Sequence, residues 1–272
     1  MTDPSLAAFG LSSAPFSKEI ADADLWLPST KAALVDTLVE AVEQRESVLL
    51  VGDAGVGKTC VLRALRHRMP KEAYRLTYCH NATLGRRDFY RQLCQALGLS
   101  PKATAAGVFY AVSGHVHELA TARVHPVFLL DEAHLLHPDV LAHLHILLNY
   151  EWDSRALLSV ILVGLPELRD RLSLSIHKPL LSRLHTRLEI QATTVDDSAE
   201  YLRFRLRRVG SEREIFAHDA IALLHTTTAG AHRDLDRLAT LALRDATRRK
   251  KKFVDRDLVQ HLLASEGAAS AD

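Results

Sequence analysis

One short stretch, GDAGVGKT at residues 52–59, constrains this chain more than any other feature. It follows the apolar run SVLLV, precedes VLRALRHRM, and matches the pattern G-x-x-x-x-G-K-[ST] in the strand-to-helix context that the pattern requires. Gly52, Gly55 and Gly57 allow the backbone to wrap closely around a polyphosphate, so that consecutive N–H groups point inward. We therefore predict a phosphate-binding loop here, in preference to a chance glycine-rich turn.

The side chains of this loop add two further functions. Lys58 is expected to place its charge on the β- and γ-phosphates, and the Thr59 hydroxyl to ligate Mg²⁺. The expected cofactors are therefore ATP and Mg²⁺. The predicted nucleotide-binding residues of the loop are Gly52, Asp53, Ala54, Gly55, Val56, Gly57, Lys58, Thr59 and Cys60.

A second motif, VFLLDE at residues 127–132, places Asp131 73 positions after Lys58 (131 − 58). An apolar strand that ends in Asp-Glu puts two carboxylates at the carboxyl edge of a sheet, where α/β proteins bind ligands. Asp131 is expected to hold Mg²⁺, and Glu132 to polarise the attacking water. An isolated acidic pair would usually be a solvated strand end, but the neighbouring phosphate loop favours the catalytic interpretation.

Short apolar runs alternate with amphipathic stretches as far as residue 190. This alternation predicts a parallel α/β sheet sandwiched by helices, the fold of P-loop NTPases, because strand-helix-strand units place helices on both faces. Beyond residue 190 only helical patterns follow, which predicts a small, all-helical C-terminal domain. We place the domains at residues 1–194 and 195–272. The expected strands lie at residues 47–52, 74–80, 126–132, 157–164 and 186–190.

The composition limits the cellular compartment and the kinds of partner that we expect for this protein. In 272 residues, 34 Lys and Arg nearly balance 33 Asp and Glu, so the formal net charge is +1 and any polyanion must be bound by local patches. The three cysteines show no C-x-x-C spacing, which favours a reducing compartment. The N-terminus lacks a basic region before an apolar run, and no apolar stretch approaches the ~20 residues of a membrane span. These features predict a cytoplasmic protein without a membrane partner.

Several segments together resemble the ExeA/TniB/TnsC-like ATPases of the AAA+ class. The segments are FGLSSAPFSKEI at 9–20, VGLPEL at 163–168, YLRFRLRRVG at 201–210 and TTAGAHRDLDRLATLALRDA at 227–246. The sequence DEAH at 131–134 also occurs in a helicase family, but those helicases need two RecA-like domains and this chain has room for one. The resemblance spans nearly the whole chain, and it implies an AAA+ core with a helical lid.

This resemblance implies further roles for arginines. Arg183 or Arg187 corresponds to the arginine finger that reaches the γ-phosphate of a neighbouring subunit, and Arg233 to the lid arginine that contacts nucleotide in its own subunit. Each of these arginines has a simpler interpretation as a surface or ion-paired side chain. The chain departs from the family at Leu165, because the residue there is often polar and a leucine cannot bond a phosphate or water.

The resemblance also implies contacts with duplex DNA. The family's DNA-facing loop corresponds to LGLSPKATAAG, with Lys102 and Thr104, and Arg86 and Arg87 are expected on the same side of the core. Such contacts would go to phosphates and would not specify sequence. A solvated loop is the alternative. The basic run RRKKK at 248–252 is open to the same two interpretations.

The implied function is an ATP-dependent DNA-binding regulator. It would assemble as a ring or filament on duplex DNA and recruit or activate a DDE transposase, with a target-selection protein as a further partner. Two alternatives stay open. One is a secretion-pathway or signalling ATPase of the ExeA type that does not act on DNA. The other is a nucleotide-switched scaffold with negligible turnover, which Leu165 favours.

Overall fold

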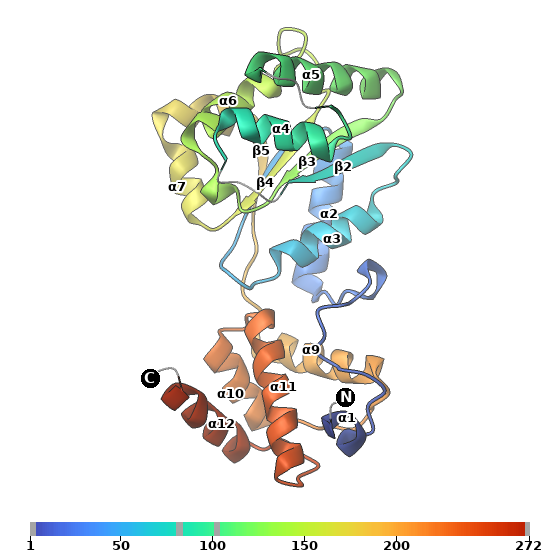
Figure 1. The fold of residues 1–272 in the computed structure, drawn as a ribbon, viewed down its shortest axis with the longest axis vertical. Helices are drawn as coiled ribbons and strands as arrows, with labels where there is room; N and C mark the ends of the chain where they lie inside the picture. The colour runs from blue at the N-terminus through green and yellow to red at the C-terminus, as the bar shows by residue number, and fades with distance from the viewer. Residues whose placement is uncertain (1–3, 80–83, 101–103, 270–272) are drawn as a thin grey trace. The chain divides into compact units, whose positions relative to one another are not determined.

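The computed structural model describes residues 4–79, 84–100 and 104–269, and it contains two compact units (Figure 1). The first unit, which we call the sheet unit, comprises residues 29–53 and 58–190. The second, the helical unit, comprises residues 1–28, 54–57 and 191–272.

The sheet unit contains one five-stranded parallel sheet with the strand order β2-β3-β4-β1-β5. All five strands expected from the apolar runs are present, so the predicted fold class is confirmed. Strands β1, β3 and β4 are buried at every position, as expected of central strands covered on both faces. The strands are β1 Ser47–Val51, β2 Tyr74–Cys79, β3 His125–Leu130, β4 Ser159–Gly164 and β5 Leu184–Glu189.

Helices cover this sheet because successive strand residues point to opposite faces. The main core joins one set of strand side chains, which includes Leu49, Leu130 and Leu162, to α4, α5, α6, α7 and α8. Helix α2 packs against α3 and against β1. The helices are α2 Ser29–Glu43, α3 Lys58–Arg68, α4 Arg86–Ala96, α5 Ala105–Thr121, α6 Pro138–Leu147, α7 Glu167–Ser173 and α8 Lys178–Leu181, with 3₁₀ turns η2 Ala133–Leu135 and η3 Ser175–His177.

The described C-terminal part of the helical unit is all-helical, as the sequence predicted, and four helices form its body. Helix α9 starts with a capping box, in which Thr194 and Asp197 each accept from the other's backbone N–H. Apolar side chains from all four helices meet in a second core, which includes Leu202, Leu224 and Leu238. The elements are α1 Pro4–Phe9, η1 Asp22–Asp24, α9 Val195–Arg208, α10 His218–Thr228, α11 His232–Arg248 and α12 Arg256–Ala269.

The N-terminal segment belongs to the helical unit, whereas we expected it to belong with the α/β domain. The physical reason is burial, since Phe9, Leu11 and Phe16 pack into the core of the helical unit. The buried Arg205 of α9 also holds this segment, donating from Nε to the carbonyl oxygen of Pro15 at 2.7 Å. Our assignment from the sequence was therefore wrong for this segment, because its partner Arg205 lies 190 positions after Pro15.

Arg205 also belongs to a buried polar cluster between α9 and α11. Its guanidinium lies 3.5 Å from a carboxylate oxygen of Asp236, and the hydroxyl of Tyr201 donates to the other oxygen at 2.8 Å. Burial raises the pKa of Asp236 to about 6, although the Arg205 charge and the Tyr201 hydrogen bond both act to lower it. The carboxyl group therefore ionises within an ordinary experimental pH range.

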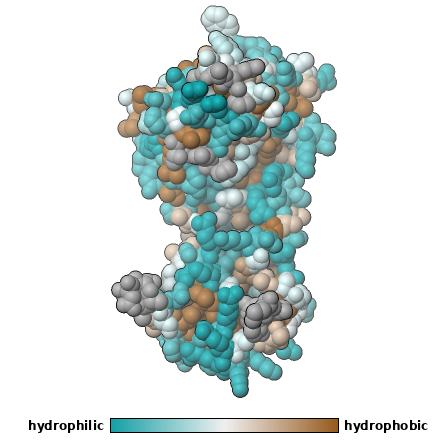
Figure 2. Space-filling view, viewed as in Figure 1, coloured by the Kyte–Doolittle hydropathy of each residue, from teal (hydrophilic) through white to brown (hydrophobic). Residues whose placement is uncertain are grey.

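No described helix combines the length and the apolar composition needed to cross a bilayer. The face of the molecule shown in Figure 2 is mostly hydrophilic, with hydrophobic groups scattered between polar ones. Scattered apolar groups of this kind are normal on protein surfaces.

The raised pKa of Asp236 predicts a pH-dependent stability. Between pH 3.8, the ordinary pKa, and about 6, the folded state binds more protons at this site than the unfolded chain does. The contribution of Asp236 to the free energy of unfolding therefore falls as pH rises through that range, by roughly 3 kcal/mol. We expect the urea-derived free energy of unfolding of the parent to fall, relative to that of Asp236→Asn, between pH 4 and pH 6.5. Other carboxylates are common to both proteins and cancel, so parallel profiles would contradict the assignment.

Candidate nucleotide-binding site

The glycine-rich loop between β1 and α3 has the backbone conformation that a phosphate-binding loop needs. Gly55 and Gly57 have φ values of +80° and +99°, a region that favours glycine. The Lys58 ammonium donates to the carbonyl oxygens of Gly52 and Asp53, each at 2.7 Å. Lys58 is only 8% exposed, so its charge is held within the loop. A buried ammonium, two glycines with positive φ and the start of an 11-residue helix together fit a nucleotide polyphosphate.

Asp131 and Glu132 follow β3 at the same carboxyl edge of the sheet. Asp131 is 4% exposed, and its Oδ1 accepts from the backbone N–H of Glu132 at 2.9 Å. Glu132 has a φ of +52°, which is uncommon for a residue with a side chain. Its side chain is 50% exposed. One carboxylate is therefore buried and fixed, while the next is half exposed, as the separate roles expected of them require.

Tyr78 of β2 contacts this site, which sequence reasoning missed. Its hydroxyl donates to Asp131 Oδ2 at 2.8 Å. In the register of β2 and β3, Tyr78 lies opposite Leu129, and Asp131 is two residues further along, on the same face. Burial, the hydrogen bond to Asp131 and the nearby carboxylates raise the pKa of Tyr78, so the hydroxyl keeps its proton and acts as a donor.

His134 is the second residue that sequence reasoning missed. Its Nε2 lies 3.6 Å from Glu132 Oε2, and its Nδ1 lies 3.4 Å from the backbone nitrogen of Leu165. The ring therefore connects the turn after β3 with the end of β4. The sequence DEAH gave no signal of this contact, which depends on β4 lying beside β3.

The oxygen ligands expected for Mg²⁺ are present in suitable chemical form. Thr59, an exposed residue in the first turn of α3, offers a hydroxyl, and Asp131 offers a buried carboxylate that accepts a hydrogen bond from Tyr78. Hydroxyl and carboxylate oxygens are hard ligands, which Mg²⁺ prefers together with phosphate oxygens and waters. The residues present thus fit Mg²⁺ bound with a nucleotide.

Comparison with known proteins identifies the domain. Residues 40–172 match the family model described as an AAA domain. This range includes the glycine-rich loop, Asp131 and Glu132. The chain contains an AAA ATPase domain.

A relative and two solved structures are similar to much of the chain. The General secretion pathway protein A of Aeromonas hydrophila is 32% identical over 239 residues, which is 86% of this chain and 43% of that protein. The chain thus spans less than half the length of that curated relative. Drosophila ORC bound to DNA has a TM-score of 0.70 at 21% identity, covering 97% of this chain and 66% of that one. Aeropyrum pernix ORC1 in complex with DNA has a TM-score of 0.64 at 20% identity, covering 88% and 66%. At these identities the two structures show a shared AAA+ fold.

The two arginine-finger candidates lie just before β5 (Arg183) and within it (Arg187). Arg183 donates to Asp153 Oδ2 at 2.7 Å and to the carbonyl oxygen of Pro179 at 3.0 Å. Arg187 is exposed on β5 and donates to the carbonyl oxygens of Leu184 and Leu181. Both guanidinium groups have local acceptors, so their contacts do not select one of them. The role of either residue as an arginine finger stays a prediction. Arg233 lies in the first turn of α11, and its expected role as the lid arginine also stays a prediction.

The candidate DNA contacts lie at the starts of α4 and α5. Arg86 and Arg87 are exposed in the first turn of α4. Thr104 caps α5, accepting from the backbone N–H of Gly107 at 3.1 Å. Arg86 and Ala106 line one pocket, so the two helix starts are neighbours. Lys102 falls outside the described residues.

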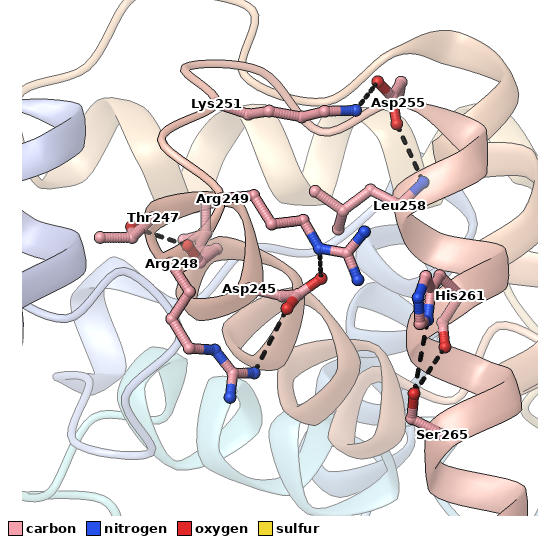
Figure 3. Close-up of polar contacts among 10 residues, drawn as sticks. Asp245, Thr247, Arg248, Arg249, Lys251, Asp255, Leu258, His261 and Ser265 are labelled. Atoms are coloured by element: carbon pink, nitrogen blue, oxygen red, sulfur yellow. Dashed lines mark hydrogen bonds and ion pairs between the residues drawn. The ribbon is translucent and has the colours of Figure 1, made fainter.

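Three side chains of the basic run at 248–252 form ion pairs within the helical unit (Figure 3). Arg248 and Arg249 pair with Asp245 at 3.4 and 2.8 Å, and Lys251 pairs with Asp255 at 2.7 Å. The run also ends α11, since the backbone N–H of Lys251 donates to the carbonyl oxygen of Ala246 at 2.8 Å. These contacts favour the structural interpretation of the run over a DNA contact.

The contact between Tyr78 and Asp131 predicts an effect on magnesium dependence. Tyr78→Phe removes the donor that orients Asp131 Oδ2, and the loss of such an outer hydrogen bond typically weakens metal affinity by 10- to 100-fold. We expect the Mg²⁺ concentration for half-maximal ATP hydrolysis to rise by about 10-fold.

Tyr74→Phe is the matched control for this experiment. Tyr74 lies on the same strand but at its other end, opposite His125. Its loss should leave the magnesium titration unchanged. A Tyr78→Phe titration that superimposes on the parent's would show that Tyr78 does not support a metal ligand.

Proposed function

We propose that this protein is an ATP-dependent DNA-binding regulator that assembles on duplex DNA and recruits or activates a DDE transposase. The observation that carries the DNA part is the pair of exposed arginines at the start of α4, beside the start of α5. The transposase and a target-selection protein are proposed from the sequence resemblance to the ExeA/TniB/TnsC-like ATPases.

The electrostatics of this surface suit a DNA backbone. Arg86 and Arg87 carry two positive charges where the dipoles of α4 and α5 present their positive ends. Arginine grips phosphate oxygens through several N–H groups. Such a surface would hold any duplex sequence, because phosphate contacts position a protein without reading bases. Two similar structures, ORC1 in complex with DNA and ORC bound to DNA, support the proposal by their common fold.

The proposed chemistry at the sheet edge divides among four side chains. Lys58 would hold the β- and γ-phosphates, and Thr59 and Asp131 would hold Mg²⁺. When bound, Mg²⁺ would neutralise charge on the phosphate oxygens. Glu132 has a carboxylate that projects from the edge and would accept a proton from the attacking water.

Self-association would link this chemistry to assembly. An arginine from an adjoining subunit, Arg183 or Arg187, would complete the site at the far end of the triphosphate, and Arg233 would bind within its own subunit. Loss of the γ-phosphate would remove the negative charge that these arginines share, and the assembly would loosen. In this way the nucleotide would control whether the protein stays on DNA.

A secretion-pathway ATPase is the second candidate, and one observation favours it. The 32% identical relative is a general secretion pathway protein, and this chain matches 43% of its length. In that role the nucleotide site would be retained, whereas nucleotide would not promote DNA binding. A nucleotide-switched scaffold with negligible turnover is a third candidate, favoured by Leu165 at a position that is often polar in the family.

DNA binding tests the proposal directly. Fluorescence anisotropy of a labelled duplex should show tighter binding with ATP or a non-hydrolysable analogue than with ADP. The double variant Arg86→Ala/Arg87→Ala should raise the Kd for duplex DNA about 10-fold or more, and should reduce the slope of log Kd against log salt by about 1–2.

A matched control removes the same charge elsewhere in the sheet unit. Arg68 and Arg155 are exposed and ion-paired, with Asp36 and Glu151 respectively. Arg68→Ala/Arg155→Ala should leave the Kd near that of the parent. No nucleotide-dependent DNA binding at low salt, with ATP hydrolysis intact, would reject the DNA proposal and favour the secretion candidate.

A further inference from the structure

His134 is placed between a carboxylate and a backbone N–H. Its side chain is 14% exposed, so the ring is largely enclosed. Nε2 faces Glu132 Oε2 at 3.6 Å, while Nδ1 faces the backbone nitrogen of Leu165 at 3.4 Å. The two ring nitrogens thus meet groups of opposite hydrogen-bonding character.

These two neighbours select one tautomer of the ring. The backbone N–H of Leu165 can only donate, so the Nδ1 that faces it must act as the acceptor and carries no proton. The neutral ring then carries its proton on Nε2, the nitrogen that faces Glu132. An ionised carboxylate can only accept, so the N–H of the ring is aimed at a suitable partner.

The backbone around His134 is held in place by Arg171 of α7. Its guanidinium donates to the carbonyl oxygen of His134, and also to that of Leu136 at 2.7 Å. Gly164 allows the close approach to β4, because a Cβ there would lie 3.1 Å from the backbone nitrogen of His134 and 3.3 Å from its Nδ1. The backbone of His134 is therefore held by α7, and its ring packs closely against the end of β4.

We propose that His134 is the positioning residue for Glu132 in ATP hydrolysis. Together with the backbone N–H of Leu165, His134 supplies the polar link at the end of β4 that the leucine side chain lacks. The link runs from Leu165 through the ring to the carboxylate that activates water. This inference rests on the proposed role of Glu132, and it explains how an ATPase site tolerates leucine at residue 165.

The distance to Glu132 fits a positioning role. At 3.6 Å, Nε2 and Oε2 are just beyond hydrogen-bond contact. The Glu132 side chain is half exposed, so a small rotation closes the gap. Catalytic hydrogen bonds are commonly long before substrate binds and shorten in the working complex. When Nε2–H bonds to one oxygen, the other oxygen remains available for water.

Steady-state kinetics of three single variants test this role. His134→Ala should lower kcat for ATP hydrolysis about 10- to 100-fold. The equilibrium Kd for ATP should change less than about twofold, because His134 contacts no phosphate-binding residue among the contacts described above. His134→Gln should keep most of the activity, since its amide N–H can reach the place of Nε2–H. His137→Ala, three residues further on at the exposed cap of α6, should keep the parent's kcat.

A double-variant cycle separates positioning from general structural damage. If His134 acts through Glu132, then adding His134→Ala to Glu132→Gln should cause no further loss of kcat. A full additional loss, or a His134→Gln variant as impaired as His134→Ala, would overturn the inference. Glu132→Gln that leaves turnover unchanged would instead reject the assignment of Glu132 itself, which is a distinct result.

A spectroscopic measurement on the parent protein needs no variant to fold. The ¹⁵N shifts of the His134 ring, assigned by the signal that His134→Gln removes, report which nitrogen carries the proton. The inference predicts that the neutral ring carries its proton on Nε2. The Nδ1–H tautomer would place a proton against the backbone N–H of Leu165, and its observation would overturn the inference.

Discussion

Strand β4 pairs with β3 on one side and with β1 on the other, and the geometry of the site depends on this pairing. Val51 at the end of β1 lies opposite Gly164 at the end of β4, while Leu130 at the end of β3 lies opposite Leu162. The phosphate loop, the acidic pair and the turn at Leu165 therefore leave the sheet at one edge. Because all three strands are buried along their whole length, this edge is a rigid frame for side chains that must be placed closely.

Local sequence patterns were sufficient to predict those parts of the site that a single segment of the chain forms. Glycine spacing predicted the loop around Lys58, and an apolar run ending in Asp131 predicted the strand and the carboxylates. Tyr78 and His134 could not be found in this way, because their contacts depend on which strands are neighbours. In the sequence, Tyr78 is an ordinary strand residue, and its contact with Asp131 exists only because β2 pairs with β3. Likewise, the sequence shows only that Leu165 lacks a polar side chain, whereas in the fold its backbone N–H faces the His134 ring. The N-terminal segment was misassigned for the same reason, since its partner Arg205 is distant in sequence.

Because the net charge of this protein is only +1, any strongly positive surface must come from a local cluster of basic residues. The basic run at 248–252 is the most obvious positive segment in the sequence, yet three of its side chains pair with Asp245 or Asp255. Arg86 and Arg87 form a shorter cluster at the start of α4, where the helix dipole adds to their charge. The position of a charge at a helix start, more than the length of a basic run, therefore decides which surface we assign to DNA. The same AAA fold is shared by proteins of secretion and of DNA binding, so the surface must discriminate between them.

The central claim is that a nucleotide triphosphate binds at the loop around Lys58. Isothermal titration of ATP with Mg²⁺ into the parent protein and into Lys58→Ala tests it most directly. Removing the buried ammonium should weaken ATP binding about 100-fold, or about 2.7 kcal/mol, the scale of a charge-assisted contact. Lys71→Ala, an exposed lysine outside the loop, should bind ATP as the parent does. Equal affinity of the parent and Lys58→Ala, with both proteins folded, would contradict the account.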